Sequence, residues 1–168
     1  SYAEHFEKEF MNSLKNFGIE MEYHFQAQEY RSGRYAEHII FALKSRKKIF
    51  DILDKHRTQD ATEEERENYY PVSIFCPHCG KDSTKIVWLS EDCTKAKYVC
   101  ECGHEGEYDF TKDHNCKLQW KVDWPMRGLA EGVDFEPGGK DHASKNGSYD
   151  TAKDVSREVF GYPAPLFQ

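Results

Sequence analysis

The sequence is short of apolar residues, has no excess of positive charge and contains no long hydrophobic run. Hydrophobic residues make up 38% of the 168 positions. This is below the roughly 45–50% of ordinary globular domains, so a bound metal would help to stabilise a modest core. The formal charge of −7 argues against a protein that coats nucleic acid through Lys and Arg, although it leaves a local RNA contact open. No stretch approaches the roughly 20 apolar residues that span a bilayer, so we expect neither DNA nor a membrane among the partners.

The sequence also lacks an initial Met and the apolar segment of a signal peptide. Together these two absences favour an internal piece of a cytoplasmic protein. A length of 168 residues suffices for one domain or two small ones.

The first third predicts the order helix, strand, helix, which is typical of an α/β layer. A helix over 2–17 is predicted by apolar residues at helical spacing, namely Phe6, Phe10, Leu14 and Phe17. Alternation over 19–26 predicts a strand with one buried face. A second helix is predicted over 35–56. We interpret its basic run, 44–48, as a solvated face, with contact to nucleic acid as the alternative.

Two cysteine pairs follow an acidic stretch, 58–68, that is interpreted as a linker or an exposed helical turn. Cys76 and Cys79 are the first pair, and Cys100 and Cys102 come after twenty intervening residues. Short β-like runs separate the pairs. Thiol pairs on turns at strand ends are typical of a zinc ribbon, in which four thiolates form a closed, structural site.

Other assignments of the cysteines stay open. The second pair has the less common Cys-x-Cys spacing, so His104 or Cys93 could replace a ligand. Cys116 is interpreted as a small buried residue. A cytoplasmic setting disfavours disulfides. A redox role for the first pair is disfavoured because such a motif should open a helix, whereas the residues after Cys79 read as a turn.

The last third concentrates polar and aromatic residues around Gly and Pro turns. Alternation over 120–124 predicts a strand, followed by a short helix over 126–131 with Pro125 at its first turn, and a second strand over 133–136. The loop that follows contains Gly138 and Gly139, which allow close approach of a ligand because they lack a Cβ, and then these two polar residues: Asp141 and His142. Their side chains could bind a ribose hydroxyl and a carboxylate or phosphate. The alternative is an ordinary strand, a tight turn and a surface His. A final helix is predicted over 151–160.

Residues 119–161 closely resemble the class I lysyl-tRNA synthetases. The resemblance lies in Gln-Trp-Lys-Val-Asp-Trp-Pro-Met-Arg, then Gly-Val-Asp-Phe-Glu-Pro-Gly-Gly-Lys-Asp-His, then Asn-Gly-Ser-Tyr-Asp, in that order. The region of paired cysteines looks like the zinc-bearing insertion of that family, and the segment 30–35 also resembles it. One departure is Gly128, where the family usually has another aromatic residue.

The resemblance implies part of a Rossmann-like α/β catalytic domain with an inserted zinc-ribbon-like β subdomain. The chain then divides into an N-terminal α/β part (1–70), the zinc-ribbon insertion (71–117) and a C-terminal α/β part (118–168). The implied enzyme uses ATP to activate L-lysine and transfers it to tRNA(Lys). The two ATP signature motifs of the family, HIGH and KMSKS, are absent from the sequence, so no catalytic residue is assigned and this piece alone is expected to be inactive.

The resemblance also implies specific site residues. Zn²⁺ would be held by Cys76, Cys79, Cys100 and Cys102. Gly139 would approach ATP and Asp141 would bond its ribose. Trp120 and His142 would line the lysine pocket, with a core position for Trp120 as the alternative. His5 would belong to a second metal site completed upstream. The competing interpretations are a non-catalytic zinc-ribbon module that binds RNA or protein, and another class I aminoacyl-tRNA synthetase.

Overall fold

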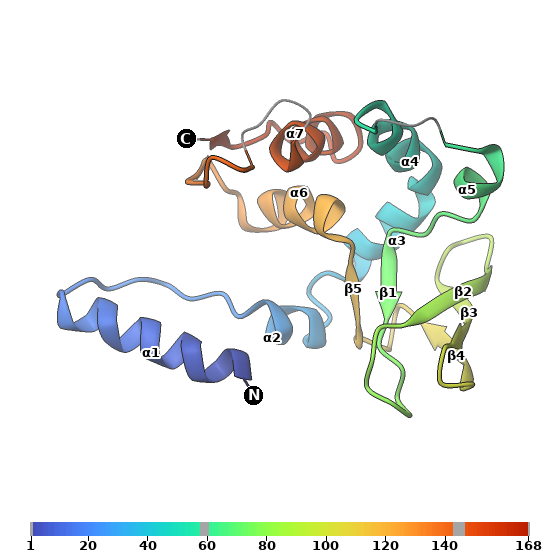
Figure 1. The fold of residues 1–168 in the computed structure, drawn as a ribbon, viewed down its shortest axis with the longest axis horizontal. Coiled ribbons are helices and arrows are strands. Elements are labelled where there is room, and N and C mark those ends of the chain that lie inside the picture. The colour runs from blue at the N-terminus through green and yellow to red at the C-terminus, as the bar shows by residue number, and fades with distance from the viewer. Residues whose placement is uncertain (1, 58–60, 143–146, 168) are drawn as a thin grey trace.

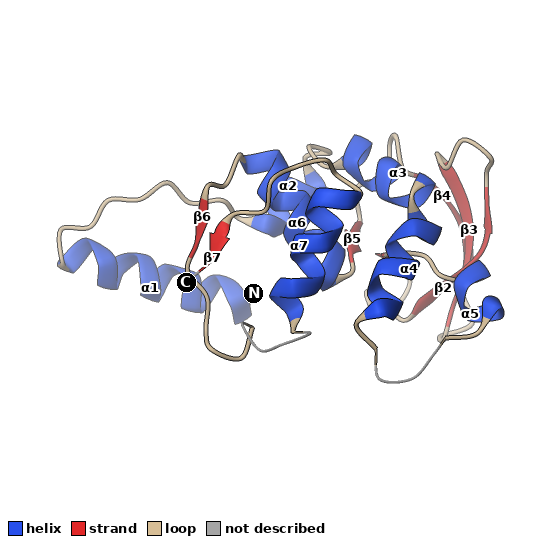
Figure 2. Cartoon of the chain, turned by 90° about the horizontal axis from the view of Figure 1, so that it is seen from above, coloured by secondary structure: helices blue, strands red, loops and turns tan. Residues whose placement is uncertain are grey.

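The computed structural model describes residues 2–57, 61–142 and 147–167. The helices in these ranges are α1 (Tyr2–Asn16), α2 (Gln26–Arg31), α3 (Ala36–Lys44), α4 (Arg46–Lys55), α5 (Glu63–Glu67), α6 (Trp120–Glu131) and α7 (Ser148–Glu158). The strands are β1 (Val72–Ile74), β2 (Thr84–Leu89), β3 (Lys95–Cys100), β4 (Glu105–Asp109), β5 (Cys116–Leu118), β6 (Phe135–Glu136) and β7 (Leu166–Phe167). The helix α1 lies at one end of the molecule and the strands β2 to β4 at the other (Figures 1 and 2). None of the described helices combines the length and apolarity needed to cross a membrane.

The strands form three small sheets. β2, β3 and β4 make an antiparallel sheet in that order, whereas β1 pairs with β5, also antiparallel, with Val72 opposite Leu118. β6 and β7 are a short parallel pair. The content is therefore mixed α/β, and the described residues include no larger parallel sheet of the Rossmann type.

One cluster of buried side chains connects the helices with the three-stranded sheet. It includes Tyr35 and Leu43 from the helical part, Tyr98 and Phe110 from the region of β3 and β4, and Met126 from α6. The division at 70/71 and 117/118 stays a prediction, and this cluster extends over both sides of each boundary. The chain enters and leaves the cysteine-bearing region through β1 and β5, which lie side by side (Figure 1).

The predictions for the first third are correct for one helix and wrong for the strand. α1 is present and Gly18 follows it with a φ of +69°, but no side chain of α1 is buried. Residues 19–25 form neither a helix nor a strand, and α2 begins at Gln26. The single helix predicted over 35–56 is two helices, α3 and α4, that meet at Ser45.

The predicted linker contains an exposed helical turn, as one of its two interpretations proposed. α5 is capped by Thr62, whose side chain accepts from the Glu65 N–H while the Glu65 carboxylate accepts from the Thr62 N–H. Positions 58–60 of that linker lie outside the described residues.

The strand predicted over 120–124 is wrong, because these residues are the first turn of α6. Pro125 is inside the helix, and the helix predicted over 126–131 is only its second half. The departure at Gly128 does not interrupt α6, and an added Cβ there would make an ordinary contact with Pro165 at 3.9 Å.

The remaining elements agree in type with the predictions but differ in extent. The strand expected over 133–136 is reduced to β6. The last helix, α7, begins at Ser148 instead of 151, and Gly161 follows it with a φ of +63°. Positions 143–146 lie outside the described residues.

Candidate functional site

The four predicted zinc ligands lie together at one end of the three-stranded sheet. Cys76 and Cys79 lie on the loop between β1 and β2, Cys100 ends β3, and Cys102 lies on the turn before β4. Their sulfur atoms are all within 4.8 Å of one another. The Sγ atoms of Cys76 and Cys102 are 3.8 Å apart, and those of Cys79 and Cys100 are 3.7 Å apart. A tetrahedral zinc ion with Zn–S bonds of about 2.3 Å separates its sulfur ligands by about 3.8 Å, so the donor set fits this metal.

Backbone hydrogen bonds hold the first two cysteines of this cluster in a tight turn. The Cys76 N–H donates to the Lys81 carbonyl at 2.8 Å and the Gly80 N–H to the Cys76 carbonyl at 2.8 Å, which closes a tight turn around the first two thiols. Gly80 adopts a φ of +73°, a conformation that favours glycine. Burial opposes ionisation of the Cys76 thiol, but hydrogen bonds from the backbone of Cys79 and His78 outweigh it and lower its pKa to about 7.

The alternative ligands are not part of this cluster. Among the described residues, the group able to hold a metal comprises the four cysteines, without His104 or Cys93. His104 stacks on His78, with ring centroids 6.1 Å apart. All six cysteines carry free thiols, and Cys116 is buried, as predicted. His5 is exposed on α1 beside Phe6, and its role in a second metal site stays a prediction.

The two residues predicted to bind lysine lie close to each other. Trp120 begins α6 and stacks on Trp124, with ring centroids 5.2 Å apart. His142 contacts both indoles, at 6.3 Å from Trp120 and 5.7 Å from Trp124. Trp120 is 49% exposed, so the alternative of a core position is wrong. Tyr149 of α7 extends this aromatic group beyond the predicted residues, at 6.2 Å from Trp124.

The two residues predicted to bind ATP are on the exposed loop after β6. Gly139 accepts a hydrogen bond from the His142 N–H at 3.0 Å, which forms the turn that presents Asp141. Apart from its chain neighbours, no atom of the described residues lies within 4 Å of an added Cβ at Gly139, so its backbone is open to a ligand on that side. The assignment of both residues to the nucleotide stays a prediction.

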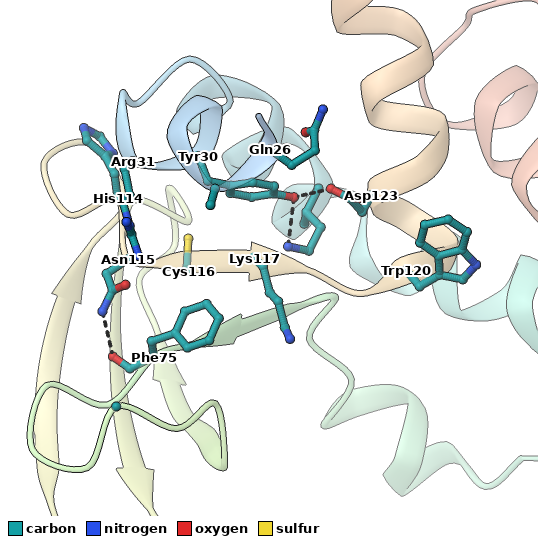
Figure 3. Close-up of a pocket in the computed structure, with 13 residues that line it drawn as sticks. Gln26, Tyr30, Arg31, Phe75, His114, Asn115, Cys116, Lys117, Trp120 and Asp123 are labelled. Carbon is teal, nitrogen blue, oxygen red and sulfur yellow. Dashed lines mark hydrogen bonds between the residues drawn. The ribbon is translucent and has the colours of Figure 1, made fainter. Parts of the chain in front are cut away.

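A cavity of about 700 Å³ opens beside Trp120, between α2, β5 and the first turn of α6 (Figure 3). Its volume lies within the roughly 300–1,000 Å³ range of small-molecule sites. The lining includes Tyr30, Phe75, Lys117 and Asp123, whereas His142 is not part of it. The sequence carried no direct indication of Asp123, because the strand predicted over 120–124 placed its side chain on the opposite face from Trp120.

Asp123 is held in this cavity by two neighbouring side chains. Its carboxylate accepts from the Tyr30 hydroxyl at 2.5 Å and from Arg127 Nε at 2.8 Å. The Tyr30 oxygen in turn accepts from the Leu118 N–H at 3.1 Å (Figure 3). Burial, together with the neighbouring Asp123 carboxylate, raises the pKa of Tyr30 well above its usual range, so the hydroxyl remains a donor at neutral pH.

Comparison with known proteins identifies the family. The family model described as "tRNA synthetases class I (K)" matches residues 1–167. The chain is 42% identical over 166 residues to a protein named "Lysine--tRNA ligase" from Pyrococcus horikoshii, covering 99% of this chain and 31% of that protein. Proteins of the same name from Treponema pallidum and Thermococcus kodakarensis are 43% and 44% identical, with coverage of 99% and 31% in both cases.

The chain therefore spans less than a third of the length of these relatives. Since the family model extends over nearly the whole sequence, the chain belongs to the class I (K) family of tRNA synthetases.

Proposed function

We propose that this chain is part of a lysine–tRNA ligase. The observation that carries the proposal is its similarity, over 99% of its residues, to proteins named lysine–tRNA ligase. The grouping of Trp120 with His142 supports it, because an apolar wall and a polar donor suit the stem and the carboxylate of lysine. The catalytic domain would be Rossmann-like, completed by residues beyond this chain.

The proposed reaction has two steps. The lysine carboxylate attacks the α-phosphate of ATP, which forms lysyl-adenylate and releases pyrophosphate. A ribose hydroxyl at the 3′ end of tRNA(Lys) then attacks the activated carbonyl, which forms lysyl-tRNA and releases AMP. Positioning and charge stabilisation dominate such chemistry. In this chain Trp120 would contact the lysine stem, His142 would donate to its carboxylate, Gly139 would approach ATP and Asp141 would bond the ribose.

The cysteine cluster would have a structural role. Cys76, Cys79, Cys100 and Cys102 would hold one Zn²⁺ and so connect the loop after β1 to the end of β3 and to the turn before β4, as in a zinc ribbon. Four protein thiolates leave no open coordination position for a substrate. The location we propose is the cytoplasm, where cysteines stay reduced and able to bind a metal.

The decisive test is aminoacylation by the full-length protein that contains this chain. Charging of unfractionated tRNA, which contains tRNA(Lys), is measured with each of the twenty amino acids in the presence of ATP, and binding of the tRNA is measured alongside. We expect charging with lysine and only background with the others. Charging of a different tRNA with a different amino acid would establish another class I specificity. Binding of tRNA without any charging would support a non-catalytic module instead.

A further inference from the structure

Tyr30 is held between α2 and the first turn of α6 by contacts from several sides. Its hydroxyl donates to Asp123 Oδ1 at 2.5 Å and accepts from the Leu118 N–H at 3.1 Å. Its ring meets the ring of Tyr35 edge-on, with centroids 5.0 Å apart. The side chain therefore has little freedom to move, and neither has the carboxylate oxygen that it contacts.

Asp123 transmits this restraint along α6. Its second oxygen, Oδ2, accepts from Arg127 Nε at 2.8 Å, one helical turn further on. The side chains of this pair are only 15% and 24% exposed, so solvent screens their attraction less than it would screen a surface pair. The orientation of Arg127 thus depends on a carboxylate that Tyr30 holds in place.

Arg127 reaches back to Trp120 on the same face of the helix. Its guanidinium carbon lies 5.7 Å from the centroid of the Trp120 ring, within the range of a cation–π contact. Counted from Trp120, the next side chains on this face follow after three, four and seven residues, namely Asp123, Trp124 and Arg127. This spacing places them along one stripe of α6. The half-exposed indole of Trp120 is therefore contacted by Arg127 as well as by Trp124 and His142.

We propose that Tyr30 is a positioning residue for Trp120, acting through Asp123 and Arg127. The inference rests on the proposed function, in which Trp120 forms a wall of the lysine site. Without the Tyr30 hydroxyl, Asp123 loses one of its two side-chain donors, and Arg127 loses a fixed partner. Binding of lysine must then order the indole, which weakens binding without changing the chemical step.

The chain contains a matched control in Tyr35. Its hydroxyl donates to Glu131 Oε1 at 2.9 Å, at the other end of α6, and it is fully buried. Both tyrosines therefore join the segment 26–35 to a carboxylate of α6. The Tyr30 hydroxyl leads to Trp120 through Asp123 and Arg127, whereas the Tyr35 hydroxyl bonds Glu131 and Gln26. If the role of Tyr30 were merely to attach α6, removing either hydroxyl would have the same kind of effect.

The experiment compares Tyr30→Phe with Tyr35→Phe in the full-length protein. For Tyr30→Phe we expect the KM for lysine to rise about fivefold, with kcat and the KM for ATP within about twofold of wild type. Tyr35→Phe should leave all three constants within about twofold. Arg127→Lys keeps the ion pair but lacks the planar guanidinium over the indole, so it should raise the KM for lysine by a smaller factor.

A second measurement reports on the indole directly. Stacked tryptophans such as Trp120 and Trp124 give an exciton couplet in circular dichroism. The variant Trp120→Phe serves as the reference spectrum in which this couplet is absent. We expect the couplet to weaken in Tyr30→Phe and to persist in Tyr35→Phe. Equal changes in both variants, or an unchanged couplet and lysine KM in Tyr30→Phe, would overturn the proposal. If Tyr30→Phe does not fold, wild-type values of both quantities in Arg127→Lys would overturn it.

The two proposals fail in different ways. Wild-type protein that does not charge tRNA with lysine would refute the proposed function, whereas the couplet still decides whether Tyr30 positions Trp120.

Discussion

At the scale of single residues, the half-exposed position of Trp120 changes what its removal should do. Trp120→Ala should raise the KM for lysine about tenfold, since one wall of the site is lost. It should destabilise the protein by less than the roughly 3–5 kcal/mol of a buried Trp, because 49% of the side chain is already exposed. Steady-state kinetics and thermal melting measure the two effects.

Trp88 provides the control, since it is 48% exposed on β2 and does not line the cavity beside Trp120. Trp88→Ala should show a similarly small loss of stability and a normal KM for lysine. A Trp120→Ala protein with a normal KM for lysine would remove Trp120 from the site.

The prediction for ATP binding concerns Asp141, which is proposed to bond the ribose. Asp141→Asn replaces a charged acceptor by a neutral amide, and charge-assisted hydrogen bonds are about twice as strong as neutral ones. We expect the KM for ATP to rise roughly tenfold, equivalent to about 1.4 kcal/mol, with an unchanged melting temperature. Asp134→Asn is the control, because Asp134 is also exposed and lies just before β6. Wild-type ATP kinetics in the Asp141 variant would contradict the assignment.

At the scale of elements, the turn between β2 and β3 should depend on pH through Asp92. Hydrogen bonds from the Ser90 hydroxyl and from the backbone and side chain of Thr94 lower the pKa of Asp92 to about 2. An unfolded Asp has a pKa of about 3.9. The stabilisation is therefore complete above about pH 4 and is lost as the pH falls through about 2.

Urea unfolding of wild type and Asp92→Asn at several pH values tests this. The wild type should be more stable near neutral pH, and the difference should shrink as the pH approaches 2. A difference that stays constant with pH would show that this carboxylate does not support the turn.

The elements also show where sequence patterns suffice and where they do not. Helical spacing located α1 and the end of α7, and paired cysteines located the cluster, because each pattern is local. The alternation over 120–124 predicted a strand, yet Trp120 and Trp124 are also one helical turn apart, and stacking of the two indoles favours the helix. The alternation over 19–26 met no partner strand among the described residues, and a strand exists only by pairing.

In the candidate site too, residues close in the sequence were predicted, whereas a contact between distant residues was not. Trp120 and His142 were predicted from a run of residues, and the structure places their rings 6.3 Å apart. The contact between Tyr30 and Asp123 joins residues 93 positions apart. No pattern in one sequence indicates such a pair, because it depends on how α2 packs against α6.

At the scale of the whole molecule, the continuous core connects the metal to the helices. Removing zinc should first expose residues 72–110 to hydrogen exchange, since the small sheet has little core of its own. The helical part should be less affected, but its stability should also fall, because the same buried cluster includes Tyr98 and Tyr35. Hydrogen exchange with and without a chelator measures both responses.

Two cysteine variants separate the metal from other effects. Cys79→Ser should lower the zinc content, whereas Cys93→Ser should retain it, because Cys93 is outside the cluster. Protein purified without chelator and found by elemental analysis to hold no zinc would disprove the metal assignment.

The pairing of β1 with β5 has a consequence for how this chain can vary in length. Val72 and Leu118 face each other across that pair. The segment between them, which carries the cysteines, therefore leaves the helical part and returns to it at the same place. The entropy of closing a loop grows only slowly with its length, by about 0.6 kcal/mol for each doubling. Insertions at the exposed Glu91, between β2 and β3, should therefore leave the helices in register. An insertion of one residue between Trp120 and Arg127 would instead rotate the two side chains apart by about 100°.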